Sequence, residues 1–281
     1  MKINVAKSAG FCFGVKRALN IALHTVEHKK NVCMLGDIVH NEDVVRTISE
    51  AGIKKIGRLS SGEGKTLLIR AHGASKETFI KAKKAGYTLV DATCLMVKEI
   101  HKIAIKKEQQ GCKIIVIGDK KHDEVKGITG QLKKQALVID SLKSIPCIAS
   151  LKKYKKAVVV VQSTQNIEKV EKVIKKLEKH IPHLEFYNTI CQPTTSKQQE
   201  ARSLPLKNEV MIVIGSKTSA NTKRLYEISK SLNKKTHWIQ SQKDLRKIWF
   251  LNVKSVGITA GASTPDKTTK EVVKRIKDFA I

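Results

Sequence analysis

The chain has 281 residues, which is enough for a sizeable core and for one to three domains. Its net charge of +29 comes mostly from lysine, hydrophobic residues make up 41%, and aromatic residues only 4%. No apolar run approaches the ~18 residues that span a bilayer, so the sequence excludes a membrane-spanning helix and indicates a globular protein with an aliphatic core.

The predicted elements follow one order three times along the chain. A helix-like segment comes first, a short apolar strand that ends at a glycine comes next, and a second apolar strand then runs into a polar turn. The expected helices are residues 15–29, 97–111 and 196–206. The apolar strands that run into polar turns are residues 66–69, 157–161 and 255–259. Alternating strands and helices predict parallel sheets with crossover helices.

A cysteine precedes each copy of this unit at a fixed spacing. A glycine follows the cysteine after 24 residues, and a histidine or serine after 28. The cysteines are Cys12, Cys94 and Cys191, the glycines are Gly36, Gly118 and Gly215, and the third positions are His40, His122 and Ser219. The repeat of about 90 residues is too long for a solenoid and predicts three small α/β lobes, residues 1–93, 94–190 and 191–281.

The repeated polar residues lie at the carboxyl ends of the predicted strands, where ligands bind in parallel sheets. The glycines are also explained by turn chemistry after duplication, but a turn has no use for a thiol. We therefore expect Cys12, Cys94 and Cys191 to face one shared place. Cys33 and Cys112 lie in or beside apolar strands and are expected in the core, and Cys147 is not expected at the shared place.

Three thiolates from distant parts of a chain are an unusual metal-binding set. Structural zinc normally takes four protein ligands, often from local cysteine pairs. An iron–sulfur cluster held by three cysteines would leave one iron without a protein ligand. Residues suited to binding phosphate are expected around it: His40, His72, His122, Ser219, Asn221, Ser263 and either Ser163 or Thr164. Glu124 is the natural carboxylate for proton transfer.

Five short motifs together resemble one known family. "GFCFGV", "RAHG", "DATC", "HDEV" and "ITAGAS" are similar to the motifs of the 4-hydroxy-3-methylbut-2-enyl diphosphate reductases, and the resemblance runs over the whole chain. It implies a three-lobed α/β trefoil around a 4Fe-4S cluster, with a 3Fe-4S form after oxygen exposure. It also implies the last step of the methylerythritol phosphate route, which yields isopentenyl and dimethylallyl diphosphate.

The resemblance assigns roles to single residues of this chain. It implies that Cys12, Cys94 and Cys191 bind the cluster and that Glu124 donates a proton. It implies that the diphosphate is held by His40, His72, His122, Ser219, Asn221 and Ser263. The expected electron donor is a ferredoxin- or flavodoxin-type protein.

Two positions depart from the family pattern. The family's "QTT" turn reads "QST" here, so Ser163 replaces the first threonine and Thr164 keeps the second. Serine keeps the hydroxyl but loses the methyl group that restricts its rotamer. Ala220 stands where the family usually has a serine, between Ser219 and Asn221, which removes one side-chain hydrogen bond to phosphate or leaves it to the backbone.

Other interpretations lack a required feature. A zinc deaminase would match His122 and Glu124 but has Ser150 in place of its second cysteine, and a P-loop would need glycine where Leu59 stands. A nucleic-acid-binding protein is suggested only by the positive charge and would carry no cofactor. The lysines are spread along polar helix faces, as in "VEKVIKKLEK", so we expect a solvated surface and no nucleic-acid or membrane partner.

The start of the chain bears on the expected compartment. Lys2 and Lys7 are present without a continuous apolar segment, so no secretory signal is expected. We therefore expect a bacterial cytoplasm or the interior of a plastid-type organelle, where disulfides between the six cysteines are not favoured.

Overall fold

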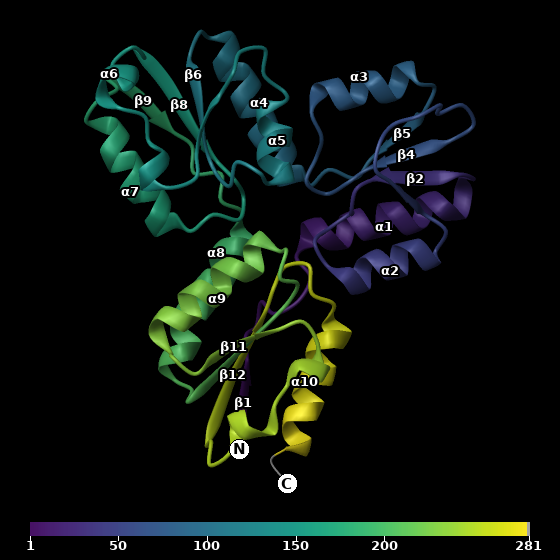
Figure 1. Ribbon diagram of the computed structural model, residues 1–281, viewed down its shortest axis with the longest axis vertical. Coiled ribbons are helices and arrows are strands. Elements are labelled where there is room, and N and C mark those ends of the chain that lie inside the picture. The colour runs from purple at the N-terminus through teal and green to yellow at the C-terminus, as the bar shows by residue number, and fades with distance from the viewer. Residues whose placement is uncertain (280–281) are drawn as a thin grey trace. The chain divides into compact units, whose positions relative to one another are not determined.

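A computed structural model describes residues 1–279, which form two compact units (Figure 1). Unit 1 consists of Met1–Lys16, Val39–Glu50 and Gln192–Ile281, and unit 2 of Arg17–Ile38 and Ala51–Cys191. The predicted α/β class with three parallel-sheet lobes is confirmed, because the strands form three four-stranded sheets in which every pairing is parallel.

Unit 1 contains one of these sheets. Its strands, in order across the sheet, are β1 (Lys2–Val5), β12 (Ser255–Ala260), β10 (Val210–Ile214) and β11 (Thr236–Ile239). Its helices are α2 (Glu42–Glu50), α8 (Gln192–Ser203), α9 (Ala220–Leu232) and α10 (Asp266–Asp278). Its short 3₁₀ helices are η2 (Leu204–Leu206), η3 (Gln242–Asp244) and η4 (Lys247–Phe250).

The core of unit 1 lies on both faces of its sheet. On one face, Ile212 and Ile214 of β10 pack with Val272 of α10. On the other face, Val213 packs with Ala201 of α8 and Leu225 of α9. Figure 1 accordingly shows α8 and α9 on one side of the sheet and α10 on the other. Consecutive residues of a strand point to opposite faces, so a continuous apolar strand such as β10 needs helices on both sides.

Unit 2 contains the other two sheets. One has the strand order β3 (Lys54–Ile56), β2 (Val32–Leu35), β4 (Thr66–Ile69) and β5 (Thr88–Asp91). The other has the order β7 (Leu137–Ile139), β6 (Lys113–Ile117), β8 (Lys156–Val161) and β9 (His183–Phe186). The helices are α3 (Lys76–Lys84), α4 (Leu95–Gln109), α5 (Asp123–Thr129), α6 (Ile148–Leu151) and α7 (Ile167–Glu178), with η1 (Leu142–Ser144) between β7 and α6. Helix α1 (Phe13–His28) has most of its residues in this unit.

The expected helices begin earlier than their apolar patterns suggested. Helices α1, α4 and α8 start at Phe13, Leu95 and Gln192, so each begins directly after one of the three repeated cysteines. The expected helix at 196–206 is wrong at its end, because α8 stops at Ser203 and Leu204–Leu206 form a 3₁₀ turn. Pro205 explains the change, since proline cannot donate the hydrogen bond that continues an α-helix.

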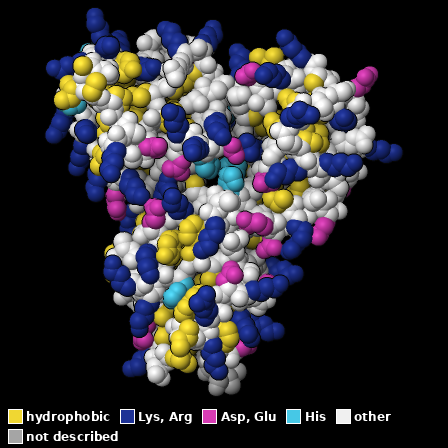
Figure 2. All heavy atoms as spheres, viewed as in Figure 1, with side chains coloured by type: hydrophobic (Ala, Val, Ile, Leu, Met, Phe, Trp, Pro, Cys, Tyr) yellow, Lys and Arg dark blue, Asp and Glu magenta, His cyan; other side chains and the backbone are white. Residues whose placement is uncertain are grey.

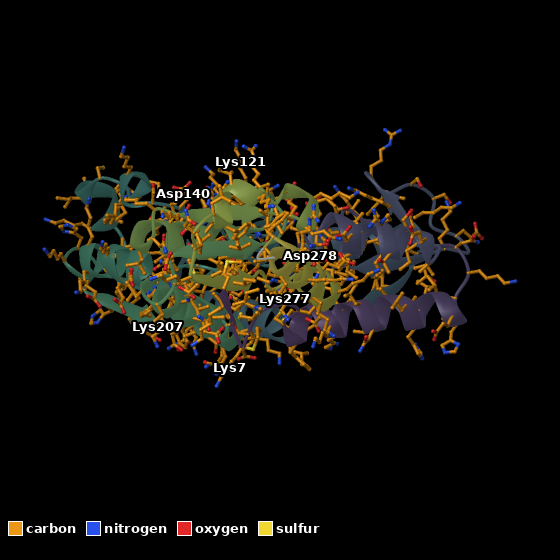
Figure 3. All side chains as sticks on the ribbon, turned by 90° about the horizontal axis from the view of Figure 1, so that it is seen from below. Lys7, Lys121, Asp140, Lys207, Lys277 and Asp278 are labelled. Atoms are coloured by element: carbon orange, nitrogen blue, oxygen red, sulfur yellow. The ribbon has the colours of Figure 1, made fainter. Side chains whose placement is uncertain are left out.

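The surface carries lysine and arginine in many places. Figure 2 shows these side chains distributed over the visible face, with acidic side chains among them. The labelled lysines of Figure 3, Lys7, Lys121, Lys207 and Lys277, lie at the surface, and Lys121 and Lys7 extend away from the ribbon. This distribution favours the solvated surface expected from the sequence. Within residues 1–279, no helix combines the length and the apolar character needed to cross a membrane.

Candidate active site

Six predicted site residues of unit 2 follow the ends of its strands. His72 follows β4, Cys94 follows β5, and Cys191 lies between β9 and α8. His122 and Glu124 follow β6, and Ser163 follows β8. The carboxyl ends of neighbouring parallel strands meet at one edge of a sheet, and this is where ligands bind.

Glu124 is the most strongly perturbed acid of this group. Its side chain is 2% exposed and lies in the first turn of α5. Its Oε1 accepts a hydrogen bond of 2.6 Å from the Ser163 backbone N–H, and its Oε2 accepts one of 2.9 Å from the Ser163 hydroxyl. Burial raises the pKa of Glu124 to about 7, against the opposing effect of the two Ser163 hydrogen bonds. The carboxyl group therefore exchanges a proton near neutral pH, as a general acid requires.

The structure distinguishes between the two hydroxyl residues of the "QST" turn. Ser163 contacts Glu124, whereas the Thr164 hydroxyl accepts a hydrogen bond of 3.0 Å from the Gln162 side chain. Ser163 is also joined to a repeated cysteine, since its carbonyl accepts a hydrogen bond of 3.1 Å from the Cys191 backbone N–H. The Glu124 carboxyl, the Ser163 hydroxyl and Cys191 thus lie in one chain of contacts.

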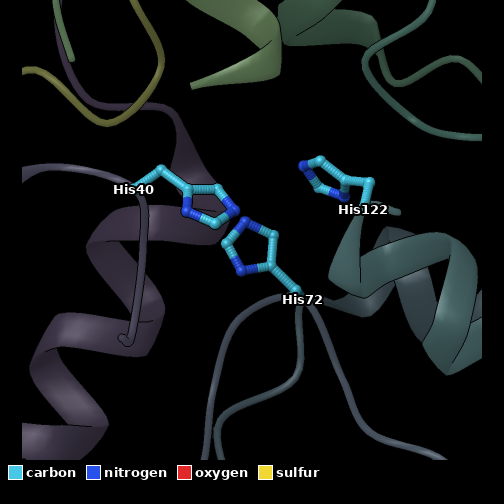
Figure 4. A group of neighbouring side chains, drawn as sticks. All are labelled: His40, His72 and His122. Carbon is cyan, nitrogen blue, oxygen red and sulfur yellow. The ribbon is translucent and has the colours of Figure 1, made fainter. Parts of the chain in front are cut away.

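His122 and His72 lie against each other in unit 2. Their rings meet edge to face with centroids 5.4 Å apart (Figure 4). His122 caps α5, and its Nδ1 accepts a hydrogen bond of 3.1 Å from the Glu124 backbone N–H. Because Nδ1 is an acceptor here, a neutral His122 carries its proton on Nε2 and donates from that atom. The Cys94 backbone N–H donates a 3.0 Å hydrogen bond to the Ala71 carbonyl, beside His72.

Six predicted site residues belong to unit 1. Cys12 immediately precedes α1, and its backbone N–H donates a 3.0 Å hydrogen bond to the Ala262 carbonyl. The hydroxyl of Ser263, the next residue, donates a 3.0 Å hydrogen bond to the carbonyl of His40, which follows β2 and is also drawn in Figure 4. The same turn of the chain therefore holds Cys12 on one side and His40 on the other.

The start of α9 in unit 1 has the features of an anion site. Ser219 caps the helix by accepting a hydrogen bond of 3.3 Å from the Thr222 backbone N–H. Asn221 is 4% exposed, yet neither polar atom of its side-chain amide has a hydrogen-bond partner among the described residues. Buried amides are normally paired, so Asn221 is suited to a ligand oxygen. Ala220, at 8% exposed, offers this site only its backbone.

The three repeated glycines have a packing explanation. A Cβ atom at these positions would lie within 2.7 Å of a neighbouring side chain in each case. The neighbours are Arg70 for Gly36, Val125 for Gly118 and Thr222 for Gly215. Each glycine therefore lets a following segment approach the strand end closely, and none of them needs a direct role in chemistry.

The six cysteines of the chain differ in exposure and in position. Cys12, Cys94 and Cys191 are partly exposed, and each directly precedes a helix. Cys33 is buried in β2, Cys112 packs against a core cluster, and Cys147 is exposed beside Ser150. None of the six cysteines forms a disulfide with another described residue.

Sequence reasoning missed one ion pair near this site. Arg70 Nη1 lies 2.8 Å from Asp123 Oδ2, and both side chains are partly buried. The pair joins the turn that carries His72 to the first residue of α5, next to His122 and Glu124. The sequence showed only "RAHG" and "HDEV" as separate motifs, and nothing in their spacing indicated this contact.

Comparisons with known proteins agree on one family. The sequence model of the LytB protein family matches residues 3–277. A 4-hydroxy-3-methylbut-2-enyl diphosphate reductase of Campylobacter hominis is 40% identical over 98% of this chain and 98% of its own length. The enzyme of the same name from Aquifex aeolicus is 37% identical over 99% of this chain and 96% of its own.

Solved structures give the same result. A structure of (E)-4-hydroxy-3-methyl-but-2-enyl diphosphate reductase, described as the terminal enzyme of the non-mevalonate pathway, has a TM-score of 0.74, is 36% identical and covers 99% of this chain and 100% of its own. The E-1-hydroxy-2-methyl-but-2-enyl-4-diphosphate reductase of Plasmodium falciparum has a TM-score of 0.89 at 27% identity, over 97% of this chain and 87% of its own.

Proposed function

The chain belongs to the LytB family and is an enzyme of its reductase class, and from this premise we propose the reaction and the residues that perform it. The substrate is 4-hydroxy-3-methylbut-2-enyl diphosphate. Two electrons and two protons are taken up, the allylic carbon–oxygen bond breaks, and one water leaves. A hydrogen at either end of the allylic system gives isopentenyl or dimethylallyl diphosphate.

We propose Cys12, Cys94 and Cys191 as the ligands of a 4Fe-4S cluster. Support comes from their setting: each is a partly exposed cysteine outside any disulfide, it directly precedes a helix, and its backbone N–H is bonded to a neighbouring turn. When bound, such a cluster supplies electrons and one iron without a protein ligand. Cys33 and Cys112 do not precede a helix, and Cys147 precedes only the four-residue helix α6 and lies outside the repeat, so these three are not part of the proposed site.

The diphosphate-binding group combines neutral donors. Ser219, Asn221 and the N–H groups at the start of α9 form its part in unit 1, and the orphaned amide of Asn221 is the strongest support for it. Nε2 of His122 donates to a phosphate oxygen, because Nδ1 is already an acceptor. The other proposed diphosphate-binding residues are His40, His72 and Ser263.

The observation that carries the proposed chemistry is the buried pair of Glu124 and Ser163. The protonated Glu124 carboxyl donates to the Ser163 hydroxyl, which in turn donates its own proton to the hydroxyl of the substrate. The leaving group is then water, a far better leaving group than hydroxide. Thr164 is bonded to Gln162 and takes a supporting position in this turn.

The test measures anaerobic turnover of the diphosphate substrate with a chemical reductant. It compares two variants, each of which replaces one glutamate by glutamine. Glu124→Gln keeps the shape and both contacts to Ser163 but removes the titrating proton, so turnover should fall by roughly 100- to 10,000-fold with the iron content unchanged. Glu77→Gln is the control, since Glu77 is exposed on α3 and pairs with Lys81. Near-normal turnover of Glu124→Gln would refute the proton-donor role.

The positive net charge of the chain suggests which kind of protein supplies the electrons. A protein with a net charge of +29 attracts acidic partners at a distance, and small acidic electron carriers of the ferredoxin or flavodoxin type fit this field. These carriers work inside the cell or organelle, which is the compartment we propose for this chain.

A further inference from the structure

Lys197 is a buried charge that the proposed mechanism does not use. It lies on α8, six residues after Cys191, and only 1% of it is exposed, which makes it the largest fully buried side chain of the described residues. Lysine is almost never fully buried unless its ammonium group is paired, because removing the charge from water is costly. The position therefore needs a specific set of partners.

The partners of Lys197 are backbone carbonyls of unit 1. Its Nζ donates to the carbonyl of Ser8, to that of Gly10 at 2.8 Å and to that of Ala260 at 3.2 Å. An ammonium group has three donor hydrogens, so three carbonyls match its capacity. Ser8 and Gly10 belong to the loop between β1 and α1, and Ala260 is the last residue of β12.

Glu200 lies one turn further along α8 and binds the same loop. It accepts hydrogen bonds from the loop, whereas Lys197 donates them. Its carboxylate accepts hydrogen bonds of 2.9 Å from the Lys7 backbone N–H and 3.0 Å from that of Ser8, and a further one from the Ser8 hydroxyl. Helix α8 thus binds both the N–H groups and the carbonyls of residues 7–10. We call Lys197 and Glu200 together the α8 clamp.

The clamped loop leads directly to Cys12. Gly10 has a left-handed φ of +101°, and a Cβ there would collide with the Asp266 carboxylate, so this loop has little freedom to adopt another shape. Two residues later, the Cys12 backbone N–H is bonded to the Ala262 carbonyl, in the turn that follows Ala260. Lys197 therefore bonds both segments that hold Cys12 in place.

We propose that Lys197 and Glu200 are positioning residues that fix the Cys12 thiol relative to the helix that begins after Cys191. This inference rests on the proposed function for the role of Cys12 as a cluster ligand. Without the ammonium group, the buried carbonyls of Gly10 and Ala260 and the partly buried carbonyl of Ser8 lose this donor, and the loop relaxes toward water.

The test measures Cys12 itself. Lys197→Met keeps an unbranched side chain, one atom shorter, and removes the charge. Alkylation of each cysteine by iodoacetamide is followed by mass spectrometry in the full-length, cluster-free chain. Cys12 should react about tenfold faster than in the unaltered chain, because a tenfold change corresponds to the loss of roughly one net hydrogen bond. Cys94 and Cys147 should keep their rates. Val272→Ala, which empties part of the unit 1 core, is the control for general destabilisation and should leave the Cys12 rate unchanged.

A second readout is iron retained after anaerobic reconstitution, which should be lost faster in Lys197→Met than in Val272→Ala. Glu200→Gln, which keeps one acceptor oxygen, is a milder variant that serves if Lys197→Met does not fold, and it should accelerate Cys12 alkylation to a smaller degree. Unchanged Cys12 rates in the folded variants would overturn the clamp. Full iron content in Cys12→Ser would instead overturn the ligand assignment and leave the clamp standing.

Discussion

Glu124 should make the folded protein less stable as the pH rises. A carboxyl group whose pKa is lowered by folding has the opposite effect. Burial raises the pKa of Glu124 from 4.5 to about 7, so the folded chain binds this proton more tightly than the unfolded chain. The free energy of unfolding contributed by this group is therefore greatest below pH 4.5 and falls as the pH rises to about 7. At ~1.4 kcal/mol per pKa unit, the loss is about 3 kcal/mol.

The perturbation that isolates this effect is Glu124→Gln. Glutamine resembles the protonated carboxyl group, since its oxygen accepts from the Ser163 backbone N–H and its nitrogen donates to the Ser163 hydroxyl. It does not titrate. The variant should be closest in stability to the unaltered chain at the acidic end of the range and should become more stable than it at pH 8, by an amount approaching ~3 kcal/mol.

Urea unfolding of the cluster-free full-length chain between pH 5 and 8.5, followed by circular dichroism, measures the difference between the two proteins. All other titrating groups are shared, so they cancel in the difference. A difference that does not change with pH, or a variant that is less stable at pH 8, would contradict the assignment of a raised pKa to Glu124.

Three further outcomes are expected. Cys94→Ser should lose most of its iron after anaerobic reconstitution while Cys112→Ser keeps it, and equal losses would remove the basis for the three-cysteine assignment. Ser163→Ala should slow turnover and shift its basic limb to higher pH, because the Ser163 hydroxyl lowers the pKa of Glu124; an unshifted pH profile counts against the relay. Ala220→Ser should lower KM by up to about tenfold through one added hydrogen bond to phosphate, with kcat little changed, and an unaltered KM would show that the backbone already suffices.

The fold class and the residues at several strand ends could be predicted because the same residue spacing recurs three times along the chain. The spacing from cysteine to glycine to histidine or serine predicted equivalent strand ends, and His122 and Ser219 do cap the helices that follow those ends. The expected lobe boundaries at 1–93, 94–190 and 191–281 stay a prediction. The pairing of β1 with β12, at opposite ends of the chain, had no local signal.

The contacts that position the site were less accessible to sequence reasoning. In a chain with 54 lysines and arginines, Lys197 looks like one more surface charge on a helix, and only the packing of α8 against residues 7–10 makes it a buried one. Arg70 and Asp123 lie 53 residues apart and meet only because β4 and α5 belong to adjacent parts of unit 2. The choice between Ser163 and Thr164 likewise depended on which hydroxyl the turn directs toward Glu124.

The most direct measurement of the central claim is product analysis in an anaerobic reaction of the reconstituted protein with 4-hydroxy-3-methylbut-2-enyl diphosphate and a titrated reductant. The account predicts isopentenyl and dimethylallyl diphosphate, with two electrons consumed for each molecule formed. Iron-loaded protein that consumes no electrons and returns the substrate unchanged would contradict it.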